Sequence, residues 1–134
     1  MKNLIVSLTL ALLASNSAHA LTAADYQASL IPAARAAEPG FAGFSAQRGE
    51  AFYRSTHGGD WSCSTCHTDR PTQPGSHAVT NKTVKPLAPA ANPARFSDAD
   101  KIEKWFKRNC NDVLKRACTP REQGDFIAYL LSVK

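Results

Sequence analysis

The chain has 134 residues, of which 43% are hydrophobic, and it carries 16 Lys and Arg against 11 Asp and Glu, a formal net charge of +5. This length is enough for one small domain, and neither an internal repeat nor a strand pattern suggests more. Four cysteines and a single methionine, Met1, limit the metal and redox chemistry that the side chains can offer.

The first residues have the pattern of a secretory signal. Met1 and Lys2 give a basic start, Leu4 to Ala14 is an apolar stretch too short to span a bilayer, and Ala18-His19-Ala20 is an A-x-A cleavage site. We expect residues 1–20 to be cleaved, which predicts an exported, periplasmic-type protein without a membrane span after cleavage. A retained membrane anchor is the alternative.

Two helices are predicted before the cysteines. The alanine-rich stretch Leu21 to Ala37 predicts a leading helix on the outside of the domain, so that residues 21–44 form a helical extension and residues 45–134 the main domain. Ser45 can cap a second helix that runs to about Ser55. Gly49 in that helix would allow another helix to cross closely.

The run Cys63-Ser64-Thr65-Cys66-His67 is the C-x-x-C-H signature of haem c attachment. Both thiols would form thioether bonds to one haem, and His67 would reach the iron as the proximal ligand. A redox dithiol or half of a zinc site is the alternative.

The net charge after cleavage of the signal is small. Without Lys2, the chain has 15 basic and 11 acidic residues, and two haem propionates would lower this net charge further. Nucleic acid is therefore a poor candidate partner.

The segment Thr68 to Phe96 has no sustained periodicity and contains several prolines (Pro71, Pro74, Pro86, Pro89 and Pro93). A connection of this length in a small domain favours a loop that wraps a ligand. We expect a backbone carbonyl of this loop to accept the second ring N–H of His67. His57 and His77 lie in loops and are expected to be solvated.

A third helix is predicted from Ser97 as N-cap to about Asn109. Ile102, Trp105 and Phe106 form an apolar stripe that we expect to face inward and line the haem pocket. At about 100° per residue, Asn109 lies about 20° from the direction of Ile102, so it is expected to point at the haem. The alternative is that Asn109 caps the helix end or bonds a backbone carbonyl.

The sixth position of the iron cannot be filled by methionine, because Met1 is the only one in the chain. The candidates are Asn109, His57, His77, another oxygen or nitrogen donor, or no ligand. Asn111 points about opposite to Asn109 on a helix.

Cys110 and Cys118 are expected to form a disulfide, since exported thiols do not stay free. A continuous helix would hold their Cα atoms about 12 Å apart, whereas a disulfide needs less than about 7 Å. The helix must therefore break within residues 111–117. A free or regulatory dithiol is the alternative.

Basic residues gather from Lys101 to Arg121. They are Lys101, Lys104, Lys107, Arg108, Lys115, Arg116 and Arg121. Such a run is either a solvated helix face or a docking surface for an acidic partner.

The last helix has the strongest start signal. Thr119 as N-cap, Pro120 at the first position and Glu122 form a capping box with its proline, and the apolar spacing continues to Leu131.

Three motifs together resemble the class I cytochromes c, an all-α fold around one haem. They are Gly49-Glu50-Ala51-Phe52-Tyr53, the run Cys63 to His67, and Asp125-Phe126-Ile127-Ala128-Tyr129-Leu130. The resemblance implies that the helices of the first and last motifs cross, with Gly49 and Tyr53 meeting Phe126 and Tyr129.

A narrower resemblance is to the SHP-type cytochromes c. It rests on Lys85-Pro86-Leu87-Ala88-Pro89, Pro93-Ala94-Arg95-Phe96, and Glu103 to Asn111 with Cys118-Thr119. The resemblance implies an asparagine ligand at Asn109, a disulfide between Cys110 and Cys118 beside the haem, and a site that reduction opens to O2, CO or NO. It also implies a dihaem or membrane b-type cytochrome as electron donor.

Two kinds of function remain open. The first is an electron-transfer protein that also binds diatomic ligands. The second is an enzyme that reduces a small oxygen or nitrogen compound, although no general acid or base is evident in the sequence. A closed electron shuttle with two histidine ligands is a third possibility.

Overall fold

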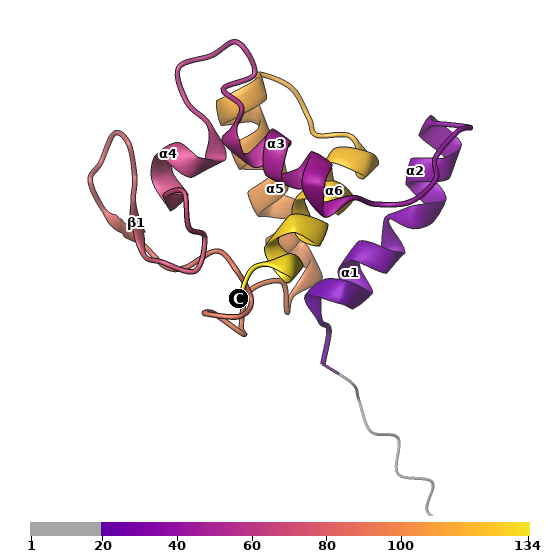
Figure 1. Ribbon diagram of the computed structural model, residues 1–134, viewed down its shortest axis with the longest axis horizontal. Helices are drawn as coiled ribbons and strands as arrows, with labels where there is room; N and C mark the ends of the chain where they lie inside the picture. The colour runs from indigo at the N-terminus through magenta and orange to yellow at the C-terminus, as the bar shows by residue number, and fades with distance from the viewer. Residues whose placement is uncertain (1–19) are drawn as a thin grey trace, which may run out of the picture.

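The computed structural model describes residues 20–134, and within them the regular secondary structure is helical apart from one short hairpin (Figure 1). The predicted signal segment lies, except for Ala20, outside the described residues. The elements are α1 (Ala23–Ser29), α2 (Ile31–Ala37), α3 (Ala46–Arg54), α4 (Cys63–His67), β1 (Gly75–Ser76), β2 (Thr83–Val84), α5 (Ala99–Leu114) and α6 (Pro120–Ser132). The all-α fold is as predicted.

The N-terminal part forms two short helices, where the sequence predicted one. Pro32 has no N–H to donate to the carbonyl four residues earlier, so the first helix ends and a second begins. Both helices pack against α6 (Figure 1). Tyr26 is 6% exposed and Ala34 is fully buried, and Gln27 donates to the Gly124 carbonyl at 2.8 Å. This part therefore packs on the outside of the domain and also contributes one buried face to the core.

Helices α3 and α6 begin as the sequence predicts. The Ser45 hydroxyl accepts from the backbone N–H of Arg48 at 3.2 Å. The capping box of α6 is complete, with Thr119 and Glu122 bonded reciprocally and Pro120 at the first helical position. Each cap satisfies N–H groups that have no partner within the helix.

The centre of the fold is the crossing of α3 and α6 (Figure 1). A Cβ on Gly49 would fall on the backbone carbonyl of Asp125 and 2.9 Å from the Cβ of Tyr129. The ring centroid of Tyr53 lies 6.2 Å from Phe126 and 5.3 Å from Tyr129. The contacts implied by the class I resemblance are confirmed.

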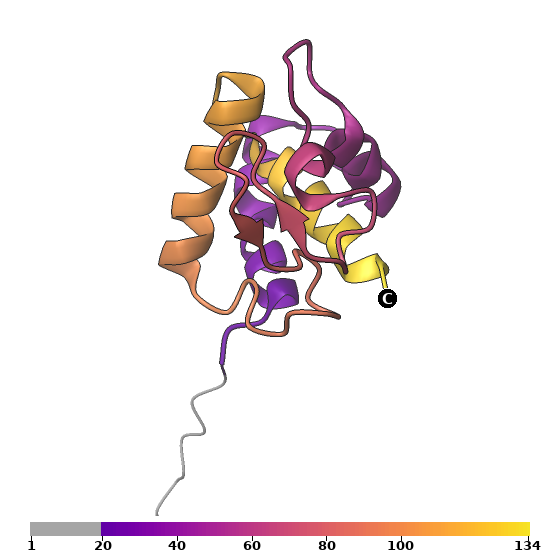
Figure 2. The same cartoon turned by 90° about the vertical axis from the view of Figure 1, so that its left-hand side faces the viewer.

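Helix α5 is longer than predicted and begins one residue later. Asp98, and not Ser97, is the N-cap, because its carboxylate accepts from the N–H of Lys101 at 3.1 Å while the Ser97 hydroxyl donates to Ala94. The helix continues to Leu114 and ends at Lys115, which has a φ of 58°. As Figure 2 shows, α5 lies along one side of the molecule, apart from α4.

The proline-rich segment contains a two-residue antiparallel hairpin that the sequence did not signal. Gly75 pairs with Val84 and Ser76 with Thr83. The rest of the segment is irregular and returns to the domain where Leu87 and Ala88 are buried. Among residues 20–134, no helix is long and apolar enough to cross a membrane.

Candidate haem site

One short helix, α4, presents the three residues of the C-x-x-C-H motif. Ser62 caps it through reciprocal bonds with Thr65. Its C-terminal end is held from α3, since the hydroxyl of buried Tyr53 donates to the Thr68 carbonyl at 2.6 Å. Cys63 and His67 are four residues apart and therefore share a face of this turn.

The environment of α4 disfavours charge on its side chains. Burial raises the pKa of the Cys63 thiol to about 11, with a smaller contribution from Cys66. Burial and the positive charge of Arg95 lower the pKa of His67 to about 4. His67 is therefore a neutral imidazole at neutral pH, the form that binds a metal.

The Nδ1 atom of His67 is buried and has no hydrogen-bond partner among the described residues. The predicted bond to a loop carbonyl is therefore absent. The Pro71 carbonyl of that loop instead accepts the backbone N–H groups of Leu87 and Ala88 at 2.8 and 2.9 Å. These two hydrogen bonds join the beginning of the loop to the segment at Leu87 and Ala88.

The hairpin packs directly on the C-terminal half of α4. A Cβ on Gly75 would fall on the Cys66 carbonyl and 3.1 Å from the Cα of His67, so only glycine fits there. The backbone N–H of Ala78 also donates to the Cys66 sulfur at 3.3 Å. The hairpin of the loop thus contacts the C-x-x-C-H motif directly.

These residues fit a covalently attached haem. Cys63 and Cys66 are not joined in a disulfide, and His67 provides a buried neutral imidazole on the same turn. Two thiols and an adjoining imidazole are the groups that haem c attachment requires. Among residues 20–134, no group of three or more His, Cys, Asp or Glu side chains is arranged to hold a metal ion without such a cofactor.

The predicted pocket residues of α5 separate onto two sides of the helix. Ile102 is 5% exposed in the core, and the Phe106 ring meets Phe126 edge-on at 5.7 Å. Trp105 is 46% exposed, with the Arg108 guanidinium 5.7 Å from its ring centroid. Trp105 therefore does not pack among the protein side chains of the core, and its place in the haem pocket stays a prediction.

Asn109 lies on the same flank of α5 as Trp105, since the two are four residues apart. It is exposed, and its side-chain amide makes no hydrogen bond with the described residues. It does not pack in the protein core, and its place at the haem stays a prediction. The alternative that it caps the helix end is wrong, because α5 continues past it to Leu114.

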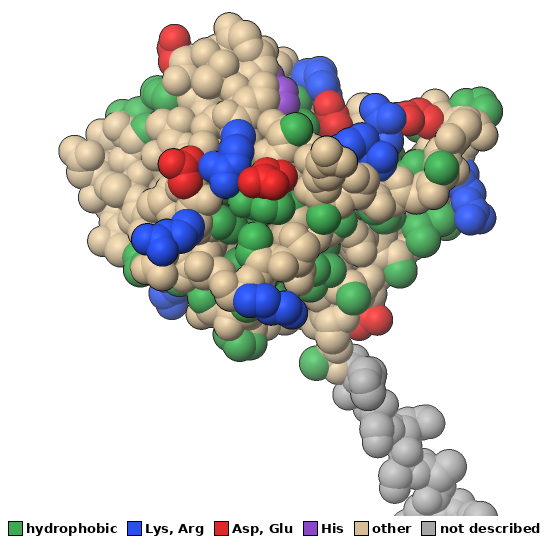
Figure 3. Space-filling model, viewed as in Figure 1, with side chains coloured by type: hydrophobic (Ala, Val, Ile, Leu, Met, Phe, Trp, Pro, Cys, Tyr) green, Lys and Arg blue, Asp and Glu red, His purple; other side chains and the backbone are tan. Residues whose placement is uncertain are grey.

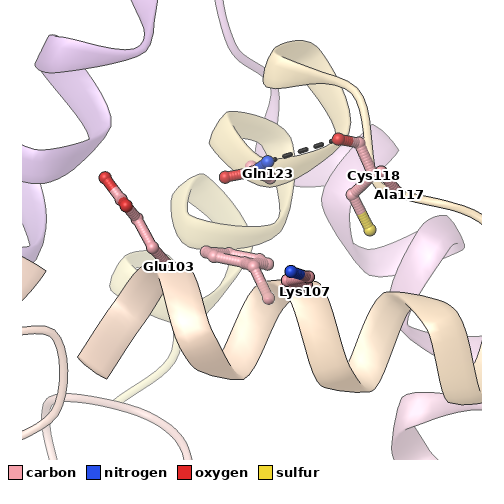
Figure 4. Close-up of a pocket in the computed structure, with 6 residues that line it drawn as sticks. Glu103, Lys107, Ala117, Cys118 and Gln123 are labelled. Carbon is pink, nitrogen blue, oxygen red and sulfur yellow. Dashed lines mark hydrogen bonds between the residues drawn. The ribbon is translucent and has the colours of Figure 1, made fainter. Parts of the chain in front are cut away.

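The disulfide between Cys110 and Cys118 is present, with Cα atoms 5.6 Å apart. The break in the helix falls at Lys115, within the predicted range. Beside it lies an open pocket of about 160 Å³ lined by Glu103, Lys107 and Gln123, in which Gln123 donates to the Cys118 carbonyl at 3.2 Å (Figure 4). This pocket is smaller than the roughly 300–1,000 Å³ of typical ligand sites.

Both loop histidines are engaged in local contacts. The ring of His57 packs on Phe52 at 4.6 Å between centroids, and its Nε2 lies 3.0 Å from the Phe52 carbonyl. The Nδ1 of His77 accepts the backbone N–H groups of Val79 and Thr80, each at 3.2 Å. Each ring thus stabilises the turn in which it lies.

The fold and these residues define a class I c-type cytochrome, whose cofactor is one covalent haem c. A family model described as a domain of unknown function, DUF1924, matches residues 39–130. Cytochrome c'' of Methylophilus methylotrophus is 38% identical over 124 residues, which cover 87% of this chain and 86% of that protein. The cytochrome c-type protein SHP of Cereibacter sphaeroides is 46% identical over 89 residues, covering 63% of this chain and 68% of that protein.

Solved structures agree with these matches. The crystal structure of oxidized cytochrome c'' aligns with a TM-score of 0.75 and 36% identity over 84% of this chain and 94% of that one. The structure of oxidized SHP, described as an oxygen binding cytochrome c, aligns with a TM-score of 0.66 and 44% identity over 78% of this chain and 94% of that one. The chain therefore belongs to the family of small c-type cytochromes that contains cytochrome c'' and SHP.

Three contacts around the site were not predicted from the sequence. Tyr53 holds the end of α4, Gly75 lets the hairpin approach it, and Arg95 acts electrostatically on His67. A glycine after Pro74 was a visible turn signal. The other two contacts join segments distant in the sequence, for which no local pattern exists.

Proposed function

We propose that this protein is an exported electron-transfer cytochrome whose iron is closed by Asn109 when ferric and opens on reduction to bind O2 or another diatomic ligand. The proposal is carried by the Asn109 amide, which is exposed and unbonded directly beside the buried disulfide on α5. When bound, the haem supplies reversible one-electron chemistry and a ferrous site for small ligands.

On the proximal side, Cys63 and Cys66 would hold the haem through thioether bonds, and His67 would ligate the iron. A metal-bound histidine usually donates its other ring N–H to a carbonyl or carboxylate. The buried Nδ1 of His67 lacks such a partner. We therefore expect the ring to be fixed by the packing of α4 between Tyr53 and the hairpin.

On the distal side, an asparagine amide oxygen is a neutral, weak donor that suits ferric iron better than ferrous. Reduction would weaken the bond between this amide oxygen and the iron. The disulfide would meanwhile keep the segment that carries Asn109 in place. Among the relatives, SHP is described as an oxygen binding cytochrome c, and a solution structure of cytochrome c'' is described as giving insights into the structural basis of haem-ligand detachment. Both descriptions support the proposal that the Asn109 ligand of this protein leaves the iron on reduction.

The contacts of His57 and His77 support a structural role for both rings rather than a closed site with two histidine ligands. Ligation through His77 Nδ1 would remove two backbone hydrogen bonds at 3.2 Å. Ligation through His57 Nε2 would remove its contact with Phe52. Each lost bond costs about 0.5–1.5 kcal/mol.

The outer side of α5 is the part of the surface that we propose for docking an acidic electron donor. Lys101, Arg116 and Arg121 form ion pairs with acidic neighbours. No ion pair of the described residues involves Lys104 or Lys107. The face in Figure 3, by contrast, mixes acidic and basic side chains. Mutating free surface charges of this kind changes the association rate and its dependence on salt.

Export is supported by the position of the first described helix relative to the predicted cleavage site. The capping box of α1 starts at Thr22, two residues after the predicted cleavage site at Ala20. Removing residues 1–20 would therefore leave every described helix intact. The division into an extension of residues 21–44 and a domain of residues 45–134 remains a proposal, and the packing of α1 and α2 on α6 predicts that the two fold together.

The test is absorption spectroscopy of the mature holoprotein, ferric and then ferrous with and without CO. We expect the ferrous protein to take up CO, and Asn109→Leu to change the ferric spectrum while CO uptake remains. Asn111→Leu is the matched control, because Asn111 is exposed on the opposite side of the same helix and should leave both spectra unchanged. A ferrous protein indifferent to CO, or a ferric spectrum unaffected by Asn109→Leu, would contradict the proposal.

A further inference from the structure

Thr68, the residue directly after His67, has a backbone conformation that is usual only for glycine. Its φ is 62° and its ψ is 172°. A residue with a Cβ is strained at these angles, and a β-branched residue is strained more than most. Such conformations persist only where the surroundings hold them, and they cluster at active and ligand-binding sites. The contacts of Thr68 must therefore offset this strain.

Hydrogen bonds from two sides hold Thr68 in place. The hydroxyl of Tyr53, a fully buried residue, donates to the Thr68 carbonyl at 2.6 Å. The Thr68 hydroxyl donates to the Arg70 carbonyl at 2.9 Å and accepts the backbone N–H of Arg70 at 3.2 Å. The carbonyl and the side chain of Thr68 are thus both fixed. Because they are fixed, a change in the φ of Thr68 would move the residue before it, which is His67.

The backbone of His67 is held from the hairpin side as well. A Cβ on Gly75 would lie 3.1 Å from the Cα of His67, so the two chains are in close contact there. The ring, in contrast, has no such support, because its buried Nδ1 lacks a hydrogen-bond partner among the described residues. A metal-bound histidine is usually oriented by that hydrogen bond. The direction of this ring must therefore come from the backbone that carries it.

We infer that Thr68 is a positioning residue for His67, and that its left-handed backbone sets the direction of the imidazole ring at the iron. The inference rests on ligation of the iron by His67, as in the proposed function, and not on the Asn109 gate. The Thr68 hydroxyl acts indirectly, because its bonds to Arg70 offset the strain of a threonine in this conformation.

This role gives opposite expectations for glycine and valine at position 68. Glycine adopts a positive φ without strain, so it should keep the same backbone although it has no hydroxyl. Valine has the shape of threonine and the same strain, but it has no hydroxyl to offset the strain. The backbone of Thr68→Val should therefore leave the left-handed region and turn the His67 ring. Thr68→Ser keeps the hydroxyl and should behave like the wild type.

The experiment is proton NMR of the ferric holoprotein with cyanide at the sixth position of the iron. The shifts of the haem ring methyl groups depend on the plane of an axial imidazole ring, whereas cyanide is symmetric about its bond to the iron. We expect Thr68→Val to change the order or the spread of these shifts, and Thr68→Gly and Thr68→Ser to keep the wild-type pattern. A role in stability alone would leave the pattern of the folded protein unchanged in every variant.

Thr72→Val is the matched control. Thr72 lies in the same loop as Thr68, and it is not one of the positive-φ residues within residues 20–134. The same substitution there should leave the methyl shifts unchanged. A wild-type pattern in Thr68→Val would overturn the inference, and so would a change no larger than that of Thr72→Val. A Thr68→Gly pattern changed as much as that of Thr68→Val would also overturn it, because the backbone angle would then not be the cause.

Tyr53→Phe provides a second test should Thr68→Val yield no holoprotein. It removes the bond that fixes the Thr68 carbonyl and leaves the Thr68 side chain in place. We expect it to change the methyl shifts too, and a wild-type pattern would overturn the inference. If cyanide does not bind, the shifts are compared in the ferric protein alone, and the same outcomes decide. A chain that carries no haem at Cys63 and Cys66 would refute the proposed function instead.

Discussion

Replacing Gly49 with alanine tests whether the crossing of α3 and α6 holds the fold together. The added Cβ would fall on the Asp125 carbonyl and 2.9 Å from the Tyr129 Cβ. These are backbone or backbone-adjacent atoms that no rotamer change can move, so the two helices must separate. Separation would also loosen the contacts of the buried Tyr53 ring with Phe126 and Tyr129.

The magnitude follows from two opposing effects. Alanine favours a helix over glycine by about 1 kcal/mol. Overpacking costs about 1–3 kcal/mol or more, and losing part of two aromatic contacts adds about 1–2 kcal/mol. We therefore expect Gly49→Ala to lower the free energy of unfolding by about 1–4 kcal/mol, with a central value that corresponds to a fall of roughly 10 °C in the melting temperature for a domain of this size.

The assay is urea unfolding of the mature holoprotein, followed by far-ultraviolet circular dichroism. The control is Gly40→Ala, because a Cβ there has nothing within 4 Å. That change should be neutral or stabilise the protein by about 0.4–1 kcal/mol through the unfolded chain. If Gly49→Ala were as stable as Gly40→Ala, the reasoning about the helix crossing would be refuted.

Two further predictions concern single contacts. Tyr53→Phe removes the bond to the Thr68 carbonyl at the end of α4 and should destabilise the holoprotein by about 1–3 kcal/mol in the same urea assay; unchanged stability would mean that water replaces the hydroxyl. For Glu122, burial raises the pKa, but hydrogen bonds from Arg116 and Thr119 outweigh it, so the pKa lies below its ordinary 4.5. The stabilisation is therefore present above pH 4.5 and is lost as pH falls through the lower folded-state pKa. Glu122→Gln should differ from the wild type at pH 7 and converge with it in acid, and a difference that stays constant with pH would contradict this reasoning.

Local sequence patterns were sufficient for the helix starts and for the cofactor motif. The caps at Ser45 and Thr119 depend only on side chains within three residues, so they could be predicted. The C-x-x-C-H run depends on one helical turn. The disulfide between Cys110 and Cys118 was expected because exported thiols do not stay free. The helix break that it requires followed from the rise of a helix and the short distance that a disulfide spans.

Local patterns were less informative for α5, whose side chains lie on more than one side of the helix. The spacing of Ile102, Trp105 and Phe106 fits one stripe, but their direction is fixed by α6 and by the disulfide. Phe106 and Cys110 face the core and Trp105 does not. A periodic pattern gives the angles between side chains around the helix axis. It does not give the side of the helix that faces the core.

The sequence by itself determined the fold class, the haem attachment motif, the lack of a methionine ligand and the candidate asparagine, because each depends on residue identity or short-range spacing. Only the tertiary structure decided that α1 and α2 contribute to the core, that Tyr53 and Gly75 hold α4, and that the charge of Arg95 lowers the pKa of His67. These contacts join segments that are distant along the chain. Their partners are selected by packing and by the cost of burying polar groups, which no local pattern encodes.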